Sequence, residues 1–185
     1  MFIQTEDTPN PATVKFLPGQ QILESGTLDF SSESDAKNAP LAARLFAIVG
    51  VSRVFLTTDF VSISKADDTD WSMLKPMILA VLMEHLSTGQ PILNEGYYDK
   101  EDASEEDDEI TKQIKILLDE RVRPMVAQDG GDIVFERFED GIVYLQMHGA
   151  CAGCPSSTAT LKVGIENMLR HYIPEVIEVR PSAEY

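Results

Sequence analysis

The chain has 185 residues, 43% of them hydrophobic, a formal net charge of −16 and two cysteines. This length allows one medium domain or two small ones, and the excess of acidic side chains argues against nucleic acid and anionic membrane surfaces as partners. No segment approaches the ~20 consecutive apolar residues of a membrane-spanning helix, and two cysteines three positions apart cannot form the disulfide framework of a small secreted domain.

The first half of the chain begins with two predicted strands and a helix. The strands are expected over residues 1–5 and 13–17, because the turn-forming residues Thr8-Pro9-Asn10-Pro11 separate them. Ser34 or Asp35 can cap a helix that runs to Val49, with Gly50 as its C-terminal stop. The apolar positions of this helix recur at helical spacing, at Leu41, Leu45 and Ile48.

Two more strands and a second helix complete this half. The strands are expected over residues 51–57 and 60–64, and Asp70 caps a helix that ends at Gly89 and that Pro76 should restart or kink. One face of this helix carries Trp71, Leu74, Ile78, Val81 and His85. Trp71 and the leucine and methionine side chains of the helix are interpreted as core packing rather than as a client surface. The order ββαββα predicts an antiparallel sheet with helices on one face.

An acidic segment separates the two halves. Between Glu95 and Glu109, nine of fifteen residues are acidic and only Lys100 is basic. Such a run repels itself and has little apolar surface to bury, so residues 93–108 are predicted to form an extended, flexible linker. The two domains are accordingly expected over residues 1–92 and 109–185.

The second half predicts a small domain with the order αββαβ, so that the whole chain is of the α+β class. The apolar stripe of its first helix is formed by Ile110, Ile114, Leu117, Leu118, Val122 and Met125. Pro124 is expected to break the last turn of this helix. The turn Asp129-Gly130-Gly131-Asp132 then leads into a hairpin of strands over residues 133–138 and 142–148.

A loop from Gly149 to Cys154 leads out of this hairpin into the second helix of the domain. Pro155 suits the first helical position, and Pro174 stops the helix. Its buried stripe is expected at Leu161, Ile165, Met168, Leu169 and Tyr172. A last strand is expected over residues 176–180.

Cys151 and Cys154 form a Cys-x-x-Cys motif and are the two cysteines of the chain. A thiolate pair at this spacing can chelate a metal or close a small disulfide, but a tetrahedral metal site or a [4Fe–4S] cluster takes about four protein ligands. The predicted position of the pair before a helix favours thiolate over thiol, which suits a metal ligand and a nucleophile equally. We expect the two sulfurs to lie near each other at an exposed edge.

The residues alone leave several chemistries open for this pair. Two copies of the chain would supply four thiolates, the number that one [4Fe–4S] cluster takes, and the small Ala152-Gly153 spacer leaves room beside the sulfurs. A thiol–disulfide oxidoreductase of the thioredoxin type builds its motif into a βαβ unit, whereas the strands before Cys151 are predicted to form a hairpin. A metal or cluster bridged between two copies is therefore favoured over thiol–disulfide exchange and over an inert pair, and a zinc-bridged structural dimer stays open as one form of the bridged metal.

Three other polar residues near the motif are interpreted as structural. His148 lies on a predicted strand and is interpreted as a packed or solvent-facing side chain rather than as a ligand. Asp129 and Asp132 flank two glycines and are interpreted as turn formers that hydrogen-bond their own backbone.

Three segments of the second half occur in a specific order and at specific spacings. They are Arg123 to Asp132, Gly149 to Ser157, and Thr160-Leu161-Lys162. Through them, about residues 109–181 resemble the C-terminal domain of NifU, the module of the Nfu iron–sulfur proteins. In the first half, Thr8-Pro9-Asn10-Pro11 with Lys15-Phe16, and Trp71 with Leu74-Lys75-Pro76, resemble the Nfu N-terminal domain.

This resemblance implies an iron–sulfur cluster scaffold or carrier rather than an enzyme. In the family, two subunits bridge a [4Fe–4S] cluster through both cysteine pairs, here Cys151 and Cys154, and pass it to apo-proteins. The implied partners are a second copy of the chain, apo iron–sulfur client proteins and upstream assembly factors. A thiol–disulfide oxidoreductase that uses the same two cysteines is the alternative function.

The start of the chain gives an expectation about location. Residues 1–19 have neither a basic region followed by an apolar core nor the arginine-rich composition of a transit peptide. We therefore expect the chain in the bacterial cytoplasm, or in the mitochondrial matrix if it is a processed form.

Overall fold

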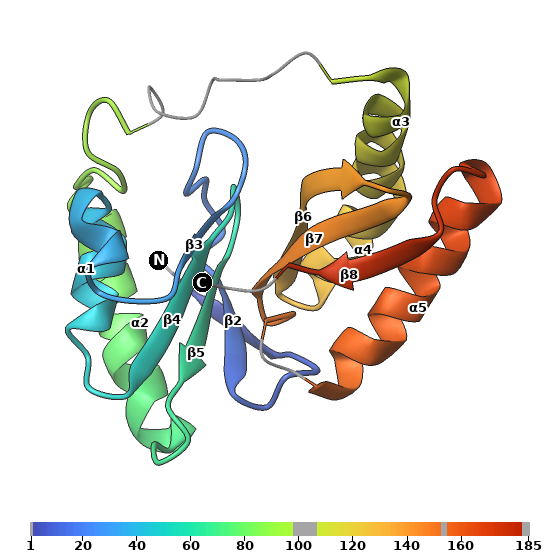
Figure 1. The fold of residues 1–185 in the computed structure, drawn as a ribbon. Coiled ribbons are helices and arrows are strands. Elements are labelled where there is room, and N and C mark those ends of the chain that lie inside the picture. The colour runs from blue at the N-terminus through green and yellow to red at the C-terminus, as the bar shows by residue number, and fades with distance from the viewer. Residues whose placement is uncertain (1, 98–106, 153–154, 183–185) are drawn as a thin grey trace. The chain divides into compact units, whose positions relative to one another are not determined.

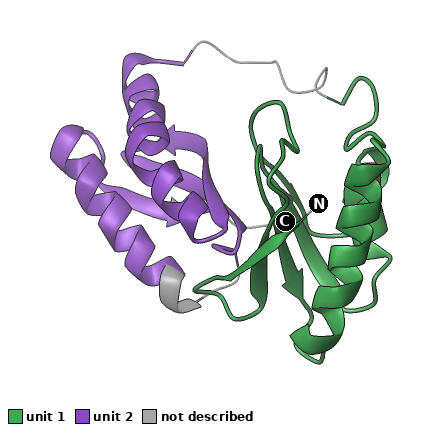
Figure 2. Cartoon of the chain, turned by 180° about the vertical axis from the view of Figure 1, so that it is seen from behind, with its two compact units in different colours: residues 1–102 green, residues 103–185 purple. Residues whose placement is uncertain are grey.

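Two separate sheets organise the chain, one in each of two units that cover residues 1–102 and 103–185 (Figure 2). The computed structural model describes residues 2–97, 107–152 and 155–182. Each unit mixes strands with helices, which confirms the predicted α+β class. The domain bounds 1–92 and 109–185 and the linker over 93–108 stay predictions, and residues 98–106 of that linker lie outside the described residues.

The first unit contains a five-stranded antiparallel sheet with the strand order β1-β2-β5-β4-β3. Its strands are β1 (Gln4–Asp7), β2 (Thr13–Leu17), β3 (Leu28–Phe30), β4 (Val51–Leu56) and β5 (Val61–Lys65). The helices α1 (Pro40–Phe46) and α2 (Trp71–Ser87) cover one face of the sheet (Figure 1). Alternate strand residues such as Phe16, Val54 and Ile63 join both helices in one buried core, because side chains of a strand alternate between its faces.

The expectations for the start of this unit are corrected at three places. The first strand covers Gln4–Asp7 rather than residues 1–5. Strand β3 was missed, and it exists through its pairing with β4 and the contact of Asp29 with Arg53 Nε at 2.9 Å. The single helix expected before Gly50 is divided into a 3-10 turn (Asp35–Asn38) and α1. Pro40 causes this division, because a residue before proline is disfavoured in helical geometry.

The expected ends of helix α2 are confirmed. The Asp70 carboxylate accepts a hydrogen bond from the Ser72 N–H at 2.7 Å, and Gly89 has a φ of 64° just beyond the helix. The helix runs through Pro76 without restarting, because residues on both sides of the proline are anchored in the same core: Leu74, Ile78 and Leu82. The interpretation of its methionines as core residues is wrong for all three, which are exposed: Met73, Met77 and Met83.

The described ends of the acidic segment make contacts with their own units. Leu93 and Tyr97 pack against the first core, and the Asn94 N–H donates to the Asn38 carbonyl at 2.9 Å. At the other end, the Asp108 carboxylate accepts from the Thr111 N–H at 2.7 Å and so caps the next helix.

The second unit contains a three-stranded sheet with the order β6-β7-β8. Strands β6 (Gly131–Glu139) and β7 (Ile142–Gly149) form the predicted hairpin, and β8 (Glu178–Pro181) pairs with β7 in parallel. The helical elements are α3 (Glu109–Leu117), a π turn (Leu118–Val122), α4 (Arg123–Gln128) and α5 (Pro155–Tyr172). Figures 1 and 2 show the helices on one face of this sheet.

The first helix of this unit continues to Gln128 instead of breaking at Pro124. The Arg123 N–H bonds the Leu118 carbonyl, which closes a π turn just before the proline. This wider turn relieves the crowding between a proline ring and the carbonyl four residues earlier. The π turn contains one residue more than an α-helical turn, which shifts the buried positions after it by one. Val126 is therefore buried, whereas Met125, which was expected in the buried stripe, is 53% exposed.

Helix α5 begins at Pro155 as predicted, and its buried stripe is partly corrected. Ile165 and Leu169 are buried, and Leu161 and Met168 pack against the same core. Tyr172 is 47% exposed, because the stripe continues at a spacing of four to the buried Ile173. The last strand covers Glu178–Pro181 rather than residues 176–180.

Candidate functional site

The cysteine motif lies in the loop that connects β7 to α5. Gly149, the last residue of β7, has a φ of 60°, a conformation that favours glycine, and its carbonyl accepts from the Ala152 N–H at 3.1 Å. The chain therefore turns sharply just before the motif. Cys154 lies outside the described residues, so the expected proximity of the two sulfurs stays a prediction.

Cys151 is buried rather than at an exposed edge. Its exposed fraction is 8%, and it packs in the core of the second unit. A Cβ atom added to Gly131 would lie 2.5 Å from the Cys151 Sγ and 2.9 Å from the Cys151 backbone N. The sulfur therefore occupies the space that glycine leaves open, which is why the side chain is directed inward.

The glycine turn and the cysteine loop are also joined through their backbones. Gly131 and Gly149 are paired across β6 and β7, and the Ala150 N–H donates to the Gly130 carbonyl at 3.2 Å. The Cys151 N–H donates to the His148 carbonyl at 3.3 Å. The Asp-Gly-Gly-Asp segment is thus part of the site, a role that the sequence interpretation as a turn did not include.

An ion pair fixes the start of β6. Asp132 is 3% exposed, and its two carboxylate oxygens each accept a hydrogen bond at 2.9 Å from the guanidinium of Arg123. The hydrogen bonds from Arg123 to Asp132 raise the pKa of the guanidinium above its ordinary value, so this charge is permanent. Asp132 Oδ1 also accepts from the Ile133 N–H at 2.8 Å.

The two flanking aspartates therefore have different roles. Asp129 is exposed at the end of α4, whereas Asp132 is buried and joins α4 to β6. For Asp132, the hydrogen bond with the Ile133 N–H agrees with the interpretation as a turn former that bonds nearby backbone, and the ion pair with Arg123 is a further role that this interpretation did not include. Opposite charges at the two ends of the Arg123 to Asp132 segment were the signal that could have predicted the pair.

Two further contacts surround the loop. The Thr158 hydroxyl on α5 donates to the Cys151 carbonyl at 3.5 Å, a long and therefore weak hydrogen bond. The loop also leads into the N-terminus of α5, where the helix dipole favours negative charge. His148 lies opposite Asp132 in the hairpin, and its Nε2 is 3.3 Å from Gln146 Oε1.

The topology around the motif differs from the expectation. Strands β7 and β8 are neighbours in parallel, with Val143 opposite Val179, and α5 connects them. The motif therefore lies in a βαβ unit, in addition to following a hairpin. Because the fold contains a βαβ unit at the motif, its topology gives no argument against thioredoxin-like chemistry.

The described residues contain no ready-made metal centre and no membrane span. Within residues 2–97, 107–152 and 155–182, no group of three or more His, Cys, Asp or Glu side chains is placed to hold a metal ion. In the same ranges, every helix is too short or too polar to cross a bilayer.

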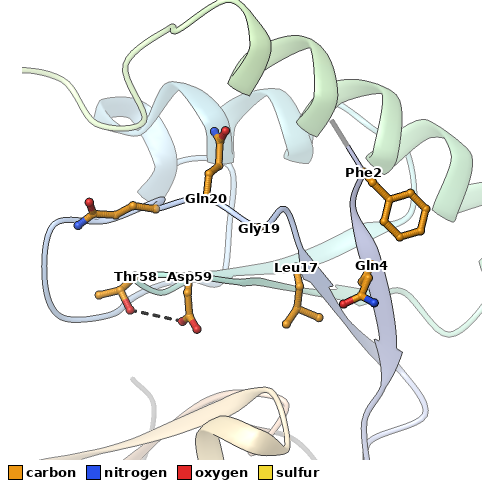
Figure 3. Close-up of a pocket in the computed structure, with 8 residues that line it drawn as sticks. Phe2, Gln4, Leu17, Gly19, Gln20, Thr58 and Asp59 are labelled. Carbon is orange, nitrogen blue, oxygen red and sulfur yellow. Dashed lines mark hydrogen bonds between the residues drawn. The ribbon is translucent and has the colours of Figure 1, made fainter.

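The first unit has a separate open groove of about 690 Å³ (Figure 3). It is lined by Phe2, Gln4, Leu17, Gly19, Gln20, Gln21, Thr58 and Asp59. Its lining combines apolar surface, as at Phe2 and Leu17, with amide, hydroxyl and carboxylate groups, and Asp59 accepts a hydrogen bond from the Thr58 hydroxyl at 3.4 Å. Because this lining contains no cysteine, the groove cannot supply thiolate ligands of the kind that Cys151 and Cys154 offer.

Comparisons with known proteins match both units. A family model described as scaffold protein Nfu/NifU N terminal matches residues 3–89, and a NifU-like domain model matches residues 114–180. A human protein named NFU1 iron-sulfur cluster scaffold homolog, mitochondrial, is 51% identical over 177 residues, which are 95% of this chain and 70% of the relative. A Drosophila ananassae protein of the same name is 51% identical over 181 residues, and the chain spans 63% of its length.

Solved structures of related domains are also similar. A solution structure of a NifU-like protein from Saccharomyces cerevisiae matches with 26% sequence identity and a TM-score of 0.47. The match covers 51% of this chain and 86% of the yeast chain.

Proposed function

The chain belongs to the Nfu family, and from this premise we propose that it is an iron–sulfur cluster scaffold that holds one [4Fe–4S] cluster between two subunits and delivers it to apo-proteins. Cys151 and Cys154 are the proposed cluster ligands. One observation carries the proposal: the chain has two cysteines, three positions apart, and both fall within the segment that the NifU-like domain model matches. A cubane cluster takes about four thiolates, so two copies of the chain must share it.

The burial of Cys151 indicates how the site opens. Its sulfur must leave the space beside Gly131 for the cluster to reach it, because only 8% of the residue is exposed. This movement needs a rearrangement of the loop between β7 and α5 and leaves the sheet in place. The ion pair of Arg123 with Asp132 holds the start of β6, so the loop moves against a fixed support.

Delivery follows from ligand exchange. An incoming thiolate of an apo-protein replaces Cys151 or Cys154 on one iron, and the displaced cysteine leaves as a thiolate. Repetition of this step moves the cluster without a change in its oxidation state, since each thiolate is replaced by another. The protein makes no new bond in a substrate molecule, so we propose a carrier and not an enzyme.

Reconstitution under strictly anaerobic conditions tests the proposal. We expect about four iron and four sulfide ions per two chains, together with a dimeric mass in solution that depends on the cluster. Cys151→Ser and Cys154→Ser should each abolish both the cluster and the dimer. Ala152→Ser is the matched control, because it adds a hydroxyl to the same loop and keeps both thiols. A complete cluster bound by a monomer would contradict the proposal.

Thiol–disulfide exchange is the second candidate function, and the βαβ unit around the motif favours it. The burial of Cys151 opposes it, because an attacking thiolate must reach its disulfide. Reduction of insulin disulfides by the iron-free monomer distinguishes the two functions. Turnover that is lost in Cys151→Ser would support this candidate over the scaffold.

Partners and location complete the proposal. The partners are a second copy of the chain, upstream assembly factors that supply the cluster and apo iron–sulfur clients that receive it. The curated relatives carry a mitochondrial name. We propose that the protein acts in a mitochondrial matrix or in the bacterial cytoplasm, both of which are reducing compartments that keep the two cysteines as thiols.

A further inference from the structure

Helix α2 is apolar on its inner and its outer side. The inner side buries Leu74, Ile78 and Leu82. The outer side exposes Met73, Met77 and Met83, with exposed fractions of 71%, 49% and 41%, and we name these three side chains the methionine face. A surface helix usually turns polar residues outward, and a helix that is apolar all round is usually covered.

The other outward positions of α2 add little polarity. The exposed residues of this helix are Ser72, Met73, Pro76, Met77, Ala80, Met83, Glu84 and Ser87. Glu84 is the charged residue among them, and it is bound by Arg44 of α1. Flexible methionine side chains adapt to partners of different shape, and exposed apolar patches of this kind mark interaction sites.

Acidic groups lie at the start of the helix that carries the methionine face. Asp67 and Asp68 are exposed just before α2, and Asp70 caps its first turn. Of the cations near this helix, Lys75 is 3.5 Å from the Asp7 carboxylate, and the charge of Lys65 acts on Asp70. Over residues 1–97, acidic side chains outnumber basic ones two to one. This acidic surplus, together with the exposed aspartates at the start of α2, favours a basic partner over an acidic one.

We propose that the methionine face docks an amphipathic helix of a partner protein, with apolar residues on Met73, Met77 and Met83 and with Lys or Arg toward Asp67 and Asp68. The inference rests on the proposed function, because a cluster carrier must hold a donor or client while thiolates exchange. A second copy of the chain is the disfavoured occupant, because it brings the same acidic groups and a net charge of −16.

Methionine methyl groups report directly on this contact. The full chain contains seven methionines, and ¹³C-methyl labelling makes each of them visible by NMR. The probe is a synthetic helix of leucine and lysine, about 18 residues or five turns long. We expect it to shift the methyl signals of the methionine face and to leave Met125 unchanged, although Met125 is also 53% exposed. A leucine and glutamate helix of equal length should bind at least about tenfold more weakly.

Variants define the site within the first unit. The double variant Met73→Ser and Met77→Ser should weaken binding of the lysine helix about tenfold. Val49→Ser is the matched control, because Val49 is 90% exposed in the same unit and lies outside α2. The double variant Asp67→Asn and Asp68→Asn should weaken binding at low salt and have little effect at about 0.5 M NaCl.

The outcomes separate this inference from the proposed function. Cys151→Ser should lose the cluster and keep helix binding, whereas the methionine double variant should keep the cluster and bind the helix about tenfold more weakly. The inference is overturned if the acidic helix binds equally well, or if Met125 shifts as much as the methionine face. It is also overturned if the methionine signals broaden with protein concentration alone, because a second copy would then be the occupant.

Discussion

At the scale of single residues, Gly131 determines where the Cys151 sulfur lies, because the two residues are in contact in the fold. The Cys151 Sγ fills the space on the Cα side of Gly131, and backbone atoms of Cys151 and His148 close the remaining sides. No larger residue fits there without moving the loop that carries the motif. The packing of Gly131 against Cys151 therefore couples the glycine turn to the cysteine motif.

Substitution of Gly131 tests this packing. In Gly131→Ala the new Cβ would lie 2.5 Å from Cys151 Sγ and 2.9 Å from the His148 carbonyl oxygen, so we expect a destabilisation of about 1–3 kcal/mol. Gly164→Ala is the matched control, because its Cβ meets nothing within 4 Å on helix α5, and it should stabilise by about 0.5–1 kcal/mol. Urea denaturation of both variants measures the difference. Equal effects would show that the sulfur does not occupy this space in solution.

His85 predicts a pH dependence of stability that is separate from the motif. The residue is fully buried on α2, its Nε2 lies 3.1 Å from the Pro91 carbonyl oxygen, and its Nδ1 has no hydrogen-bond partner among the described residues. Burial is the main cause that lowers the pKa of His85 below its ordinary value of 6.5. The folded protein therefore holds this side chain neutral where the unfolded chain is already protonated.

The sign of the effect follows from proton linkage. Below pH 6.5 the unfolded chain binds a proton that the folded protein does not, so the free energy of unfolding falls as the pH falls. His85→Gln can keep the hydrogen bond to the Pro91 carbonyl and cannot titrate. We expect the variant to lose less stability than the original chain between about pH 7.5 and about pH 5.5. Thermal unfolding at both pH values measures this; parallel losses in the two proteins would count against it.

At the scale of elements, the π turn before Pro124 sets the register of α4. It extends the buried stripe from Ile114 and Leu118 through Val122 to Val126. A continuous α-helix would place Met125 in that stripe, because eleven residues complete about three turns. The extra residue of the π turn rotates the helical residues that follow it about the helix axis. The start of β6 and the ion pair between Arg123 and Asp132 therefore depend on this turn.

Two alanine variants test this register. Val126→Ala should cost about 2 kcal/mol, because Val126 is 2% exposed in the second core. Met125→Ala should change stability by less than about 0.5 kcal/mol, because Met125 is half exposed. Denaturant titration gives both values. The reverse order of the two effects would indicate an uninterrupted α-helix in solution.

At the scale of the whole molecule, charge opposes the assembly that the proposed function needs. Each copy carries a formal net charge of −16, so two copies repel each other, and the proposed shared cluster has to overcome this repulsion. In the proposed function, the repulsion would keep cluster-free copies apart and make the dimer depend on its cargo. It also favours basic partners over a second copy at any exposed surface.

Salt should therefore strengthen the cluster-bridged dimer. Raising NaCl from about 0.02 M to about 0.3 M shortens the screening length several-fold, so we expect the apparent dissociation constant of the dimer to fall. Analytical ultracentrifugation of the loaded protein at both concentrations measures it. A dimer that weakens with salt would mean that attractive ion pairs, and not repulsion, dominate the interface.

The amino-acid sequence by itself determined the features whose causes lie within a few residues of each other. Asp70 caps α2 through the N–H of Ser72, and Asp140 and Gly141 adopt the positive φ values of 52° and 79° that turn β6 into β7. The composition fixed the number of thiolates per chain, and with it the need for two copies in the proposed site. The cap and the turn depend on the backbone geometry of neighbouring residues, and the number of thiolates is read from the composition. None of them requires a contact with a distant residue.

Only the tertiary structure decided the features that depend on distant residues. Strand β3 exists through its pairing with β4, and the parallel pairing of β7 with β8 turns a hairpin into a βαβ unit. The burial of Cys151 depends on a glycine twenty positions earlier in the chain, and the exposure of Met73 depends on which face of α2 meets the sheet. The physical reason is that local propensity sets the shape of an element, whereas burial and pairing are set by whatever the fold brings beside it.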